Sequence, residues 1–262
     1  MPATKQKHKP TNRPEGFRGR KGSSVMTTSS KSTLISAFAT LLSFAVLARP
    51  CAAQSYNAAG DFSATSNPNG AWSYGWSYGV GSAFNLSTTN TAAYAPGVPL
   101  SGWLGNENPA PFTGYPYALH NGTAGPATNN IFTVYQPGQL AESPGDSNEC
   151  SVIRWTAPAS GTFNIAATFS GLSSKGDSAD VHILHDGTSI FDSAVNPNPA
   201  SYSGLQNMLA GDTIDFVVGN EGNGANEDTT ALSATIVPEP GPLGLVGMGL
   251  GCLLSFRFLK RK

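Results

Sequence analysis

The stretch DVHILHDGTSIFD, residues 180–192, decides the fold class of this 262-residue chain. Two short, largely apolar segments, 181–185 and 188–192, flank the pair Asp186-Gly187. An Asp-Gly pair between such segments is a strong signal for a two-residue hairpin turn of type I′, in which both central residues take a positive φ. The stretch therefore predicts two antiparallel β-strands joined by a tight turn.

Similar short segments recur on both sides of this hairpin, each bounded by Gly, Pro or Asp. They predict strands over residues 151–156, 162–169, 212–218 and 231–237. Helical periodicity is missing between residues 54 and 237, and the Pro-, Gly- and Asn-rich region 87–130 predicts long loops between short strands. The expected fold is all-β: a two-sheet antiparallel β-sandwich, jelly-roll-like, over residues 54–236.

A row of aromatic residues lies in AWSYGWSYG, residues 71–79, where Trp72, Tyr74, Trp76 and Tyr78 occupy every second position. In a strand such residues share one face. Exposed, the row would stack on sugar rings; buried, it would fill the core, which is the favoured interpretation. A bulge at Gly75 would split the row between the two, so three arrangements stay open.

Four further aromatic residues in the loop-rich region, Trp103, Tyr115, Tyr117 and Tyr135, are candidates for exposed contact. The first three, together with Trp76, are the candidate glycan contacts. The four residues of the loop-rich region follow no regular spacing, so no alternating pattern assigns them to the core. Sugars stack their C–H faces on such rings, so exposed ones could contact a glycan.

The segment between Gln54 and Val237 is strongly acidic, although the whole chain has a net charge of −1. It contains two basic residues, Arg154 and Lys175, against fourteen acidic ones, a net charge of −12. Such a surface repels nucleic acid, so no nucleic-acid partner is expected. Cys150 is the one cysteine of this segment, which excludes an intramolecular disulfide there.

Catalytic motifs are missing from the sequence. There is no zinc-ligand spacing, no G-x-S-x-G motif and no phosphate-binding loop. His182 and His185 are three positions apart on a predicted strand and should face opposite sides, and His120 is isolated in a loop. We therefore assign no catalytic residue and expect no enzyme; a glycoside-processing enzyme that uses two of the carboxylates is the alternative.

The N-terminal region predicts export. Residues 34–47 are uncharged and mostly apolar, as in a signal peptide, and small residues precede a cleavage point between Ala53 and Gln54. Counted from Met1 the leader has 53 residues, and counted from Met26 it has 28. Because signal peptides usually span about 15–30 residues, Met26 is the expected start. Signal peptidase would then be a partner, with export by the Sec route.

The C-terminal stretch VPEPGPLGLVGMGLGCLLSFRFLKRK, residues 237–262, has three parts. Val237, Pro238, Glu239 and Pro240 come first, then an apolar segment, 243–259, of about 26 Å if helical. The end is basic, with the residues Arg257, Lys260, Arg261 and Lys262. On length alone this is a marginal transmembrane anchor.

In motif, order and position this tail resembles the PEP-CTERM sorting signal of exported bacterial proteins. The resemblance implies a bacterial source, recognition by a membrane-embedded exosortase, transient membrane anchoring, removal of the tail near residues 238–240, and delivery to the cell surface or an extracellular polysaccharide matrix. The domains would be a leader at 1–53, an ectodomain at 54–236 and a sorting signal at 237–262.

The ectodomain resembles domains common among PEP-CTERM proteins and, in general form, carbohydrate-binding-module jelly rolls. That resemblance implies a structural calcium ion between early and late strands, and we expect Asp61 and Asp228 as its ligands, the latter in the Gly- and Asn-rich loop 219–230. No other cofactor is expected. The preferred function is a non-enzymatic, structural or glycan-associating role; a carbohydrate-binding module with an aromatic groove is the alternative.

Overall fold

The computed structural model describes residues 54–94, 97–105, 114–128, 133–175, 178–195 and 198–240. These residues form sixteen β-strands and no helix, so the described part of the chain contains no helical segment suited to crossing a membrane. The predicted signal peptide, the segment 243–259 and the basic tail lie outside the described residues.

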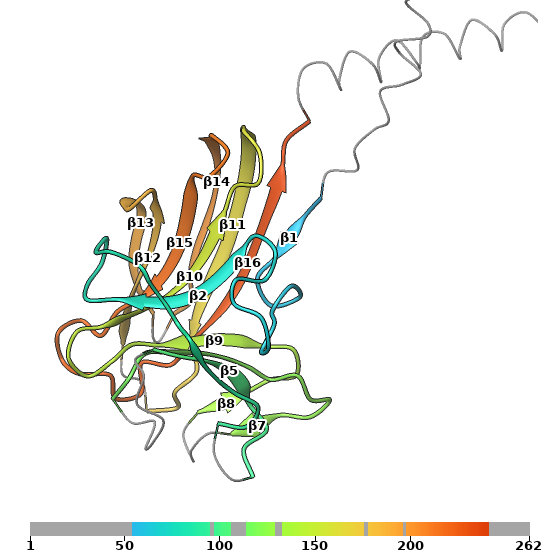
Figure 1. Cartoon of the computed structure of the whole chain (residues 1–262). Helices are drawn as coiled ribbons and strands as arrows, with labels where there is room; N and C mark the ends of the chain where they lie inside the picture. Colours follow the sequence, from blue (N-terminus) through green and yellow to red (C-terminus); the bar gives the residue numbers. More distant parts are fainter. Residues whose placement is uncertain are drawn as a thin grey trace, which may run out of the picture. The chain divides into compact units, whose positions relative to one another are not determined.

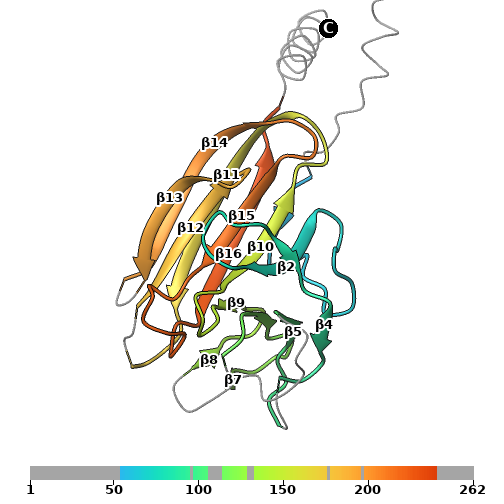
Figure 2. The same ribbon diagram turned by 60° about the vertical axis from the view of Figure 1, so that its left-hand side comes forward.

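Two antiparallel sheets face each other (Figures 1 and 2). Sheet A runs in the order β14 (Ala200–Met208), β11 (Gly161–Gly171), β16 (Thr230–Pro238), β9 (Leu140–Ser143), β6 (Tyr117–His120), β5 (Ser101–Leu104) and β4 (Thr89–Thr91), with β1 (Tyr56–Asn57) also paired to β16. Sheet B runs in the order β13 (Thr188–Val195), β12 (Ala179–His185), β15 (Thr213–Val218), β10 (Cys150–Thr156), β2 (Trp72–Ser77) and β3 (Asn85–Leu86). A small ribbon pairs β7 (Ala127–Thr128) with β8 (Val134–Tyr135). The predicted all-β antiparallel sandwich is thereby confirmed.

The hairpin predicted from residues 180–192 is present as β12 and β13. Asp186 and Gly187 have φ values of 49° and 77°, as a type I′ turn requires. The other four predicted strands match β10, β11, β15 and β16 to within about two residues. Strand β14 was not predicted, because its apolar residues do not alternate with polar ones: Leu205 is exposed, and the partly buried positions include Gly204 and Gln206.

The main core fills the space between the two sheets. Strand β11 shows how the chain supplies it: Phe163, Ile165, Ala167 and Phe169 are buried, and the residues between them are partly exposed. This period of two is the sandwich pattern of apolar residues inside and polar residues outside. The described residues of this core run from Tyr56 to Ile236.

A second apolar cluster lies on the opposite side of sheet A and includes Leu119, Tyr135 and Ala231. It occupies the part of sheet A near β6 and β9. Strand β16 therefore has one end, at Ala231, beneath this cluster, and further along it presents Ser233 to solvent. The candidate site lies where the covered part of this face of sheet A, at Ala231, meets the exposed part, at Ser233.

The first and last strands of the domain pair with each other, with Tyr56 opposite Ile236. Phe163 of β11 pairs with Pro238, and the Thr162 carbonyl accepts a hydrogen bond from the Glu239 amide. The described part of the chain therefore begins and finishes at the same end of the sandwich. The turns that follow β10, β12 and β14 lie at that end as well.

Candidate functional site

The aromatic row of residues 72–78 is split between core and surface. Trp72 and Tyr74 are fully buried, Trp76 is partly exposed, and Tyr78 is 70% exposed with its ring packed edge-on against that of Trp76 at 4.8 Å. No bulge causes the split, because β2 keeps a continuous register with β10 through Gly75. The row leaves the core because it extends past the part of the interior that Trp155 and Phe216 fill.

The remaining candidate glycan contacts differ in exposure. Trp103 is 6% exposed and donates its indole N–H to the Ser63 carbonyl at 2.7 Å. Tyr117 is 8% exposed, with its hydroxyl 3.1 Å from Thr229 Oγ1. Neither ring offers a free face, whereas Tyr115 is partly exposed. Two of the four candidate rings are therefore buried, and Trp76 and Tyr115 are partly exposed. Tyr135, a further candidate for exposed contact, is fully buried.

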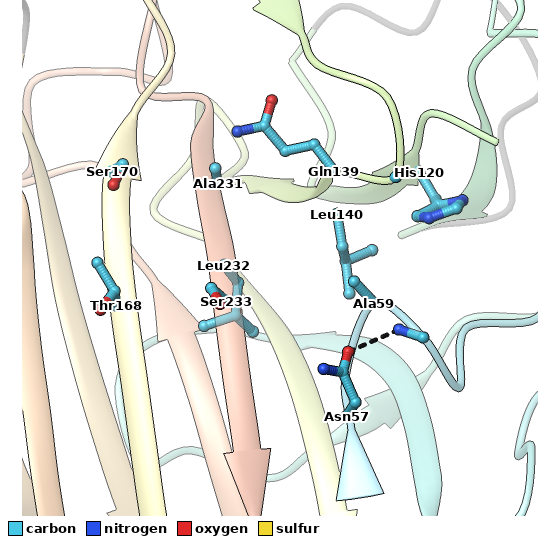
Figure 3. Close-up of a pocket in the computed structure, with 12 residues that line it drawn as sticks. Asn57, Ala59, His120, Gln139, Leu140, Thr168, Ser170, Ala231, Leu232 and Ser233 are labelled. Carbon is cyan, nitrogen blue, oxygen red and sulfur yellow. Dashed lines mark hydrogen bonds between the residues drawn. The ribbon is translucent and has the colours of Figure 1, made fainter. Parts of the chain in front are cut away.

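A hollow lies instead on the outward face of sheet A (Figure 3). It encloses about 600 Å³ and is floored by outward-facing residues of β11 and β16, namely Thr168, Ser170 and Ser233. The turn that follows β1, with Asn57, and the turn before β9, with Gln139, form its sides.

The strand pairing explains why a hollow forms here. On one edge, β16 pairs with β9 through residues 230–232 and with β1 through residues 235–236. The two short strands lie end to end along β16, and the hollow sits at their junction, near Ser233. The Asn57 side chain braces the adjoining turn, because its Oδ1 accepts a hydrogen bond from the Gly60 amide at 2.7 Å (Figure 3).

A second, shallower hollow of about 350 Å³ extends the first across the sheet. The two share Thr168 and Ser233, and the second adds Ser201, Ser203 and Thr235 from β14 and β16. Together they form one continuous depression, which we call the sheet A trough. It crosses three strands, β14, β11 and β16.

The sheet A trough contains no Asp, Glu, Lys or Arg among its lining residues. His120 is its one titratable imidazole; burial lowers the pKa of His120, partly offset by a hydrogen bond with the Gly138 backbone, so the ring is neutral near pH 7. The ring stacks on Phe62 at 5.0 Å, which fixes its orientation beside the trough. The lining is thus uncharged near pH 7: hydroxyl, amide and imidazole groups lie among apolar residues such as Leu140, Ala231 and Leu232, within a segment whose net charge is −12.

The two expected calcium ligands lie far apart. Asp61 accepts hydrogen bonds from the Asn57 amide at 2.8 Å and from the Trp72 indole at 3.2 Å, next to the Thr235 end of β16. Asp228 is buried just before Thr230, where β16 begins. Five strand residues, about 16 Å, separate these ends, so the structure does not bring the two carboxylates to one ion.

Other residues selected from the sequence have simpler environments. Cys150 is a free, buried thiol, and burial raises its pKa to about 12, which suits an inert side chain. Val237 and Pro238 end β16, while Glu239 and Pro240 are exposed beyond it. Gln54 is exposed as well, and the residues on the other side of that predicted cleavage point lie outside the described region.

The sheet A trough had no clear signal in the sequence. Its residues come from six separate segments, and its polar members are Ser, Thr, Asn and Gln, which also form ordinary solvated strand faces. The one available hint was the alternation in 162–169, which places Thr168 outward. Nothing local showed that β1 and β9 would meet beside Ser233.

Comparisons with known proteins add little beyond the fold class. No protein-family model matches the chain, and no curated protein matches it in sequence. Among solved structures it is similar to a CBM51 domain from Clostridium perfringens GH95 in complex with methyl-galactose, at 13% identity over 48% of this chain and 90% of that chain, with a TM-score of 0.31.

Two other solved structures are similar at the same level. One is the CBM36-1 domain of a multidomain xylanase from the hindgut metagenome of Trinervitermes trinervoides, at 16% identity over 48% of this chain and 98% of that chain, with a TM-score of 0.28. The other is rabbit GITRL, at 16% identity over 34% of this chain and 73% of that chain, with a TM-score of 0.26. Scores this low carry no argument about what the present protein binds.

Proposed function

We propose that this protein is an exported, non-enzymatic β-sandwich that associates with a neutral polysaccharide through the sheet A trough. The observation that supports this most strongly is the uncharged lining of the trough on a segment with a net charge of −12. Hydroxyl and amide groups exchange hydrogen bonds readily with sugar hydroxyls, whereas an anionic polymer would be repelled by the surrounding charge.

The shape of the trough favours a polymer over a small molecule. Its floor is a sheet face that crosses three strands, with side walls only at the β1 and β8–β9 turns. Pockets for small ligands usually bury most of the ligand's surface, which an open floor does not do. An extended chain of sugars lies along such a floor without needing enclosure.

An enzyme would need different groups in the trough. Glycoside hydrolysis requires a pair of carboxylic residues about 5–10 Å apart. The lining supplies none, so the trough suits binding without cleavage.

A purely structural role is the second candidate. It is favoured by the composition of the outward face of sheet A, because small hydroxyl residues are also what a solvated face of an antiparallel sheet carries. In that case the polysaccharide would not be retained.

The route to the surface is part of the proposal. The similarity of residues 237–262 to a PEP-CTERM signal supports signal-peptidase and exosortase processing, and Glu239 and Pro240 of the motif are exposed beyond β16. Mass spectrometry of the protein from a bacterium with and without its exosortase tests this. A tail removed near Pro240 only in the presence of the enzyme supports it; an intact tail in both strains contradicts it.

Polysaccharide binding is tested with the full chain in mild detergent, incubated with insoluble neutral polysaccharides and assayed for reducing sugar in the same tubes. Ser233→Arg places a long side chain over the floor of the trough. Ser193→Arg makes the same change at an exposed position of β13 in sheet B and serves as the matched control.

We expect retention of the wild type without sugar release, at least tenfold weaker retention of Ser233→Arg, and unchanged retention of Ser193→Arg. Release of reducing sugar would contradict the proposal and indicate a glycoside-processing enzyme. If both variants are retained on the polysaccharide equally well, the binding surface is not the sheet A trough. If the wild type is not retained at all, the structural role is the remaining candidate.

A further inference from the structure

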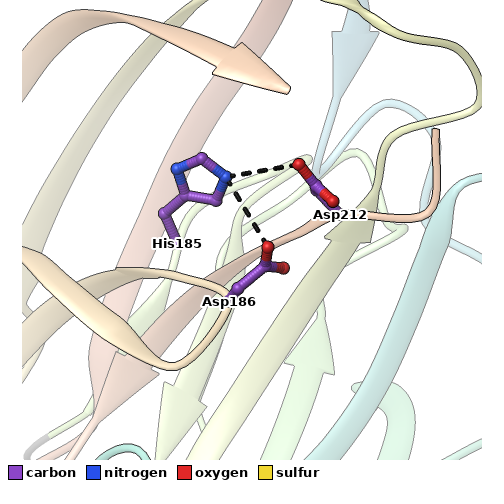
Figure 4. Close-up of side chains that lie close together, drawn as sticks. All are labelled: His185, Asp186 and Asp212. Carbon is purple, nitrogen blue, oxygen red and sulfur yellow. Dashed lines mark ion pairs between the residues drawn. The ribbon is translucent and has the colours of Figure 1, made fainter. Parts of the chain in front are cut away.

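Three side chains that no part of the proposed function uses converge at the end of the sandwich (Figure 4). His185 is the last residue of β12, Asp186 is the first residue of the type I′ turn, and Asp212 directly precedes β15. One ligand atom from each lies within 4.8 Å of the other two. Two turns that are distant in the sequence therefore present one imidazole and two carboxylates to the same point.

The distances in this cluster fit an ion better than hydrogen bonds. His185 Nε2 lies 3.9 Å from Asp186 Oδ2 and 3.7 Å from Asp212 Oδ2. Both separations exceed hydrogen-bond length. In tetrahedral zinc sites, bonds of about 2.0–2.2 Å place neighbouring ligand atoms about 3.4 Å apart. Small side-chain rotations would bring the three atoms onto one ion.

The imidazole is oriented for coordination. His185 Nδ1 lies 3.3 Å from Gln206 Oε1 on β14, and the same amide donates from its Nε2 to the Tyr202 hydroxyl at 3.0 Å. With Gln206 placed this way, Nδ1 is the ring nitrogen that contacts the amide, and Nε2 is the one that faces the two carboxylates. A metal-bound histidine is commonly held by such a hydrogen bond from its other nitrogen.

Both carboxylates are anchored by other hydrogen bonds. Asp186 Oδ1 accepts from the Thr213 amide at 2.7 Å, which leaves Oδ2 toward His185. Asp212 Oδ2 accepts from the Leu209 amide at 2.7 Å and retains a lone pair for a further partner. Ligands held in this way lose little conformational entropy on binding an ion.

The negative charge of the cluster is not balanced by a basic residue. Arg154 and Lys175 are the only Lys or Arg residues between Gln54 and Val237. Arg154 pairs with Asp215 and Lys175 with Glu227. The side chain of Asp186 is 52% exposed, so an ion reaches the cluster directly from solvent.

His182, three residues earlier on the same strand, provides a contrast. Its two nitrogens contact two different carboxylates at hydrogen-bond distance, Asp180 at 2.8 Å and Asp192 at 2.6 Å. That ring has no nitrogen left for a metal. In the His185 cluster a single nitrogen faces both carboxylates at longer range, with its second nitrogen used by Gln206.

We propose that His185, Asp186 and Asp212 form a binding site for a first-row divalent transition-metal ion, with Zn²⁺ as the probe. One imidazole and two carboxylates suit such ions, and the imidazole disfavours Ca²⁺ and Mg²⁺. A water molecule would complete the coordination. The site joins the β12–β13 and β14–β15 turns, and it is independent of the proposed polysaccharide binding.

The test is a titration of the full chain in mild detergent with ZnCl₂, followed by calorimetry and by the thermal midpoint of unfolding. Asp186→Asn removes a ligand charge at low structural risk, because Asn-Gly also favours the type I′ turn. His185→Gln removes the nitrogen ligand, and His182→Gln is the matched control from the same strand.

For the wild type and His182→Gln we expect one Zn²⁺ per chain and a higher midpoint of unfolding. For Asp186→Asn and His185→Gln we expect at least tenfold weaker binding. Co²⁺ in place of Zn²⁺ should give visible absorption that disappears in the same two variants. Absence of binding to the wild type, or equal binding to Asp186→Asn, overturns the site. Loss in His182→Gln alone would place the ion at Asp180 and Asp192 instead, and would also overturn it.

Discussion

The outward faces of the two sheets share strand geometry but differ in chemistry. On sheet A the exposed groups are neutral, and neighbouring hydroxyls meet across strands, as Thr168 and Ser201 do at 3.0 Å. On sheet B they include ionic groups that pair across strands: Arg154 forms two hydrogen bonds to Asp215, at 2.7 and 2.8 Å, and stacks over Phe84 at 4.3 Å.

This difference in chemistry suggests different roles for the exposed groups of the two sheets, stability for the ionic groups and binding for the neutral ones. A charged group committed to a bidentate partner is unavailable to a ligand, and removing one member leaves the other uncompensated. Neutral hydroxyls exchange partners at little cost, so under the proposed function sheet A would contact a ligand, while the ion pair on sheet B contributes to stability. Three predictions test this contrast.

The largest effect is expected for Arg154→Met. The Asp215 side chain is only 7% exposed, and the substitution leaves it without its bidentate partner, which should lower the free energy of unfolding by about 3 kcal/mol. Urea denaturation measures this loss. Thr168→Val, on the outward face of sheet A, is the matched change and should stay within about 0.5 kcal/mol of the wild type. Similar losses for both variants would remove the contrast between the faces.

His182 should make sheet B sensitive to pH. Burial alone lowers its pKa, but hydrogen bonds to Asp180 and Asp192 outweigh burial, so the pKa of His182 is raised. A raised pKa contributes stability that is fully present below the unfolded value of about 6.5 and is lost as pH rises through the folded pKa.

We therefore expect the wild type to exceed His182→Gln in stability by at most about 1 kcal/mol near pH 6, and by less at pH 9. The advantage should decline again in acid, because the pKa of Asp192 is lowered by its hydrogen bond with His182 and that carboxylate must then be protonated. Urea titrations from pH 3 to pH 9 measure the profile. A constant difference across this range would contradict the pairing.

His120, beside the sheet A trough, should have the smallest effect and the opposite sign. Burial lowers its pKa, so the folded state favours the neutral ring. As pH falls through the unfolded pKa of about 6.5, the unfolded chain gains a proton first and the wild type loses stability. His120→Gln should lack this loss, with a difference below about 1 kcal/mol at pH 5, measured in the same titrations. A greater acid sensitivity of the variant would show that the ring is charged in the fold.

Much of the fold was predictable because it depends on local signals. Asp186-Gly187 fixes a turn by its own backbone preference, and the alternation in 162–169 places one set of side chains inward whatever the partner strand is. Strand β14 was missed because its polar sequence lacks that alternation. Its strand conformation comes from nine pairings with β11.

The candidate sites were largely beyond prediction. The opposite orientation of His182 and His185 follows from strand geometry and is confirmed by their pairing with Val217 and Ile214. That His185 would meet Asp212 depends on where the β14–β15 turn packs, which no local pattern encodes. The separation of Asp61 from Asp228 likewise follows from the register of β1 along β16.

The sequence by itself determined the antiparallel strands, the hairpin and an acidic segment without a disulfide, because turn preferences, side-chain alternation and charge are properties of neighbouring residues or of composition. Only the tertiary structure decided which rings of residues 72–78 are buried, that a neutral trough lies along Ser233, and that one imidazole faces two carboxylates at the end of the sandwich. Those features depend on how strands distant in the sequence align, and alignment is set by the packing of the whole core.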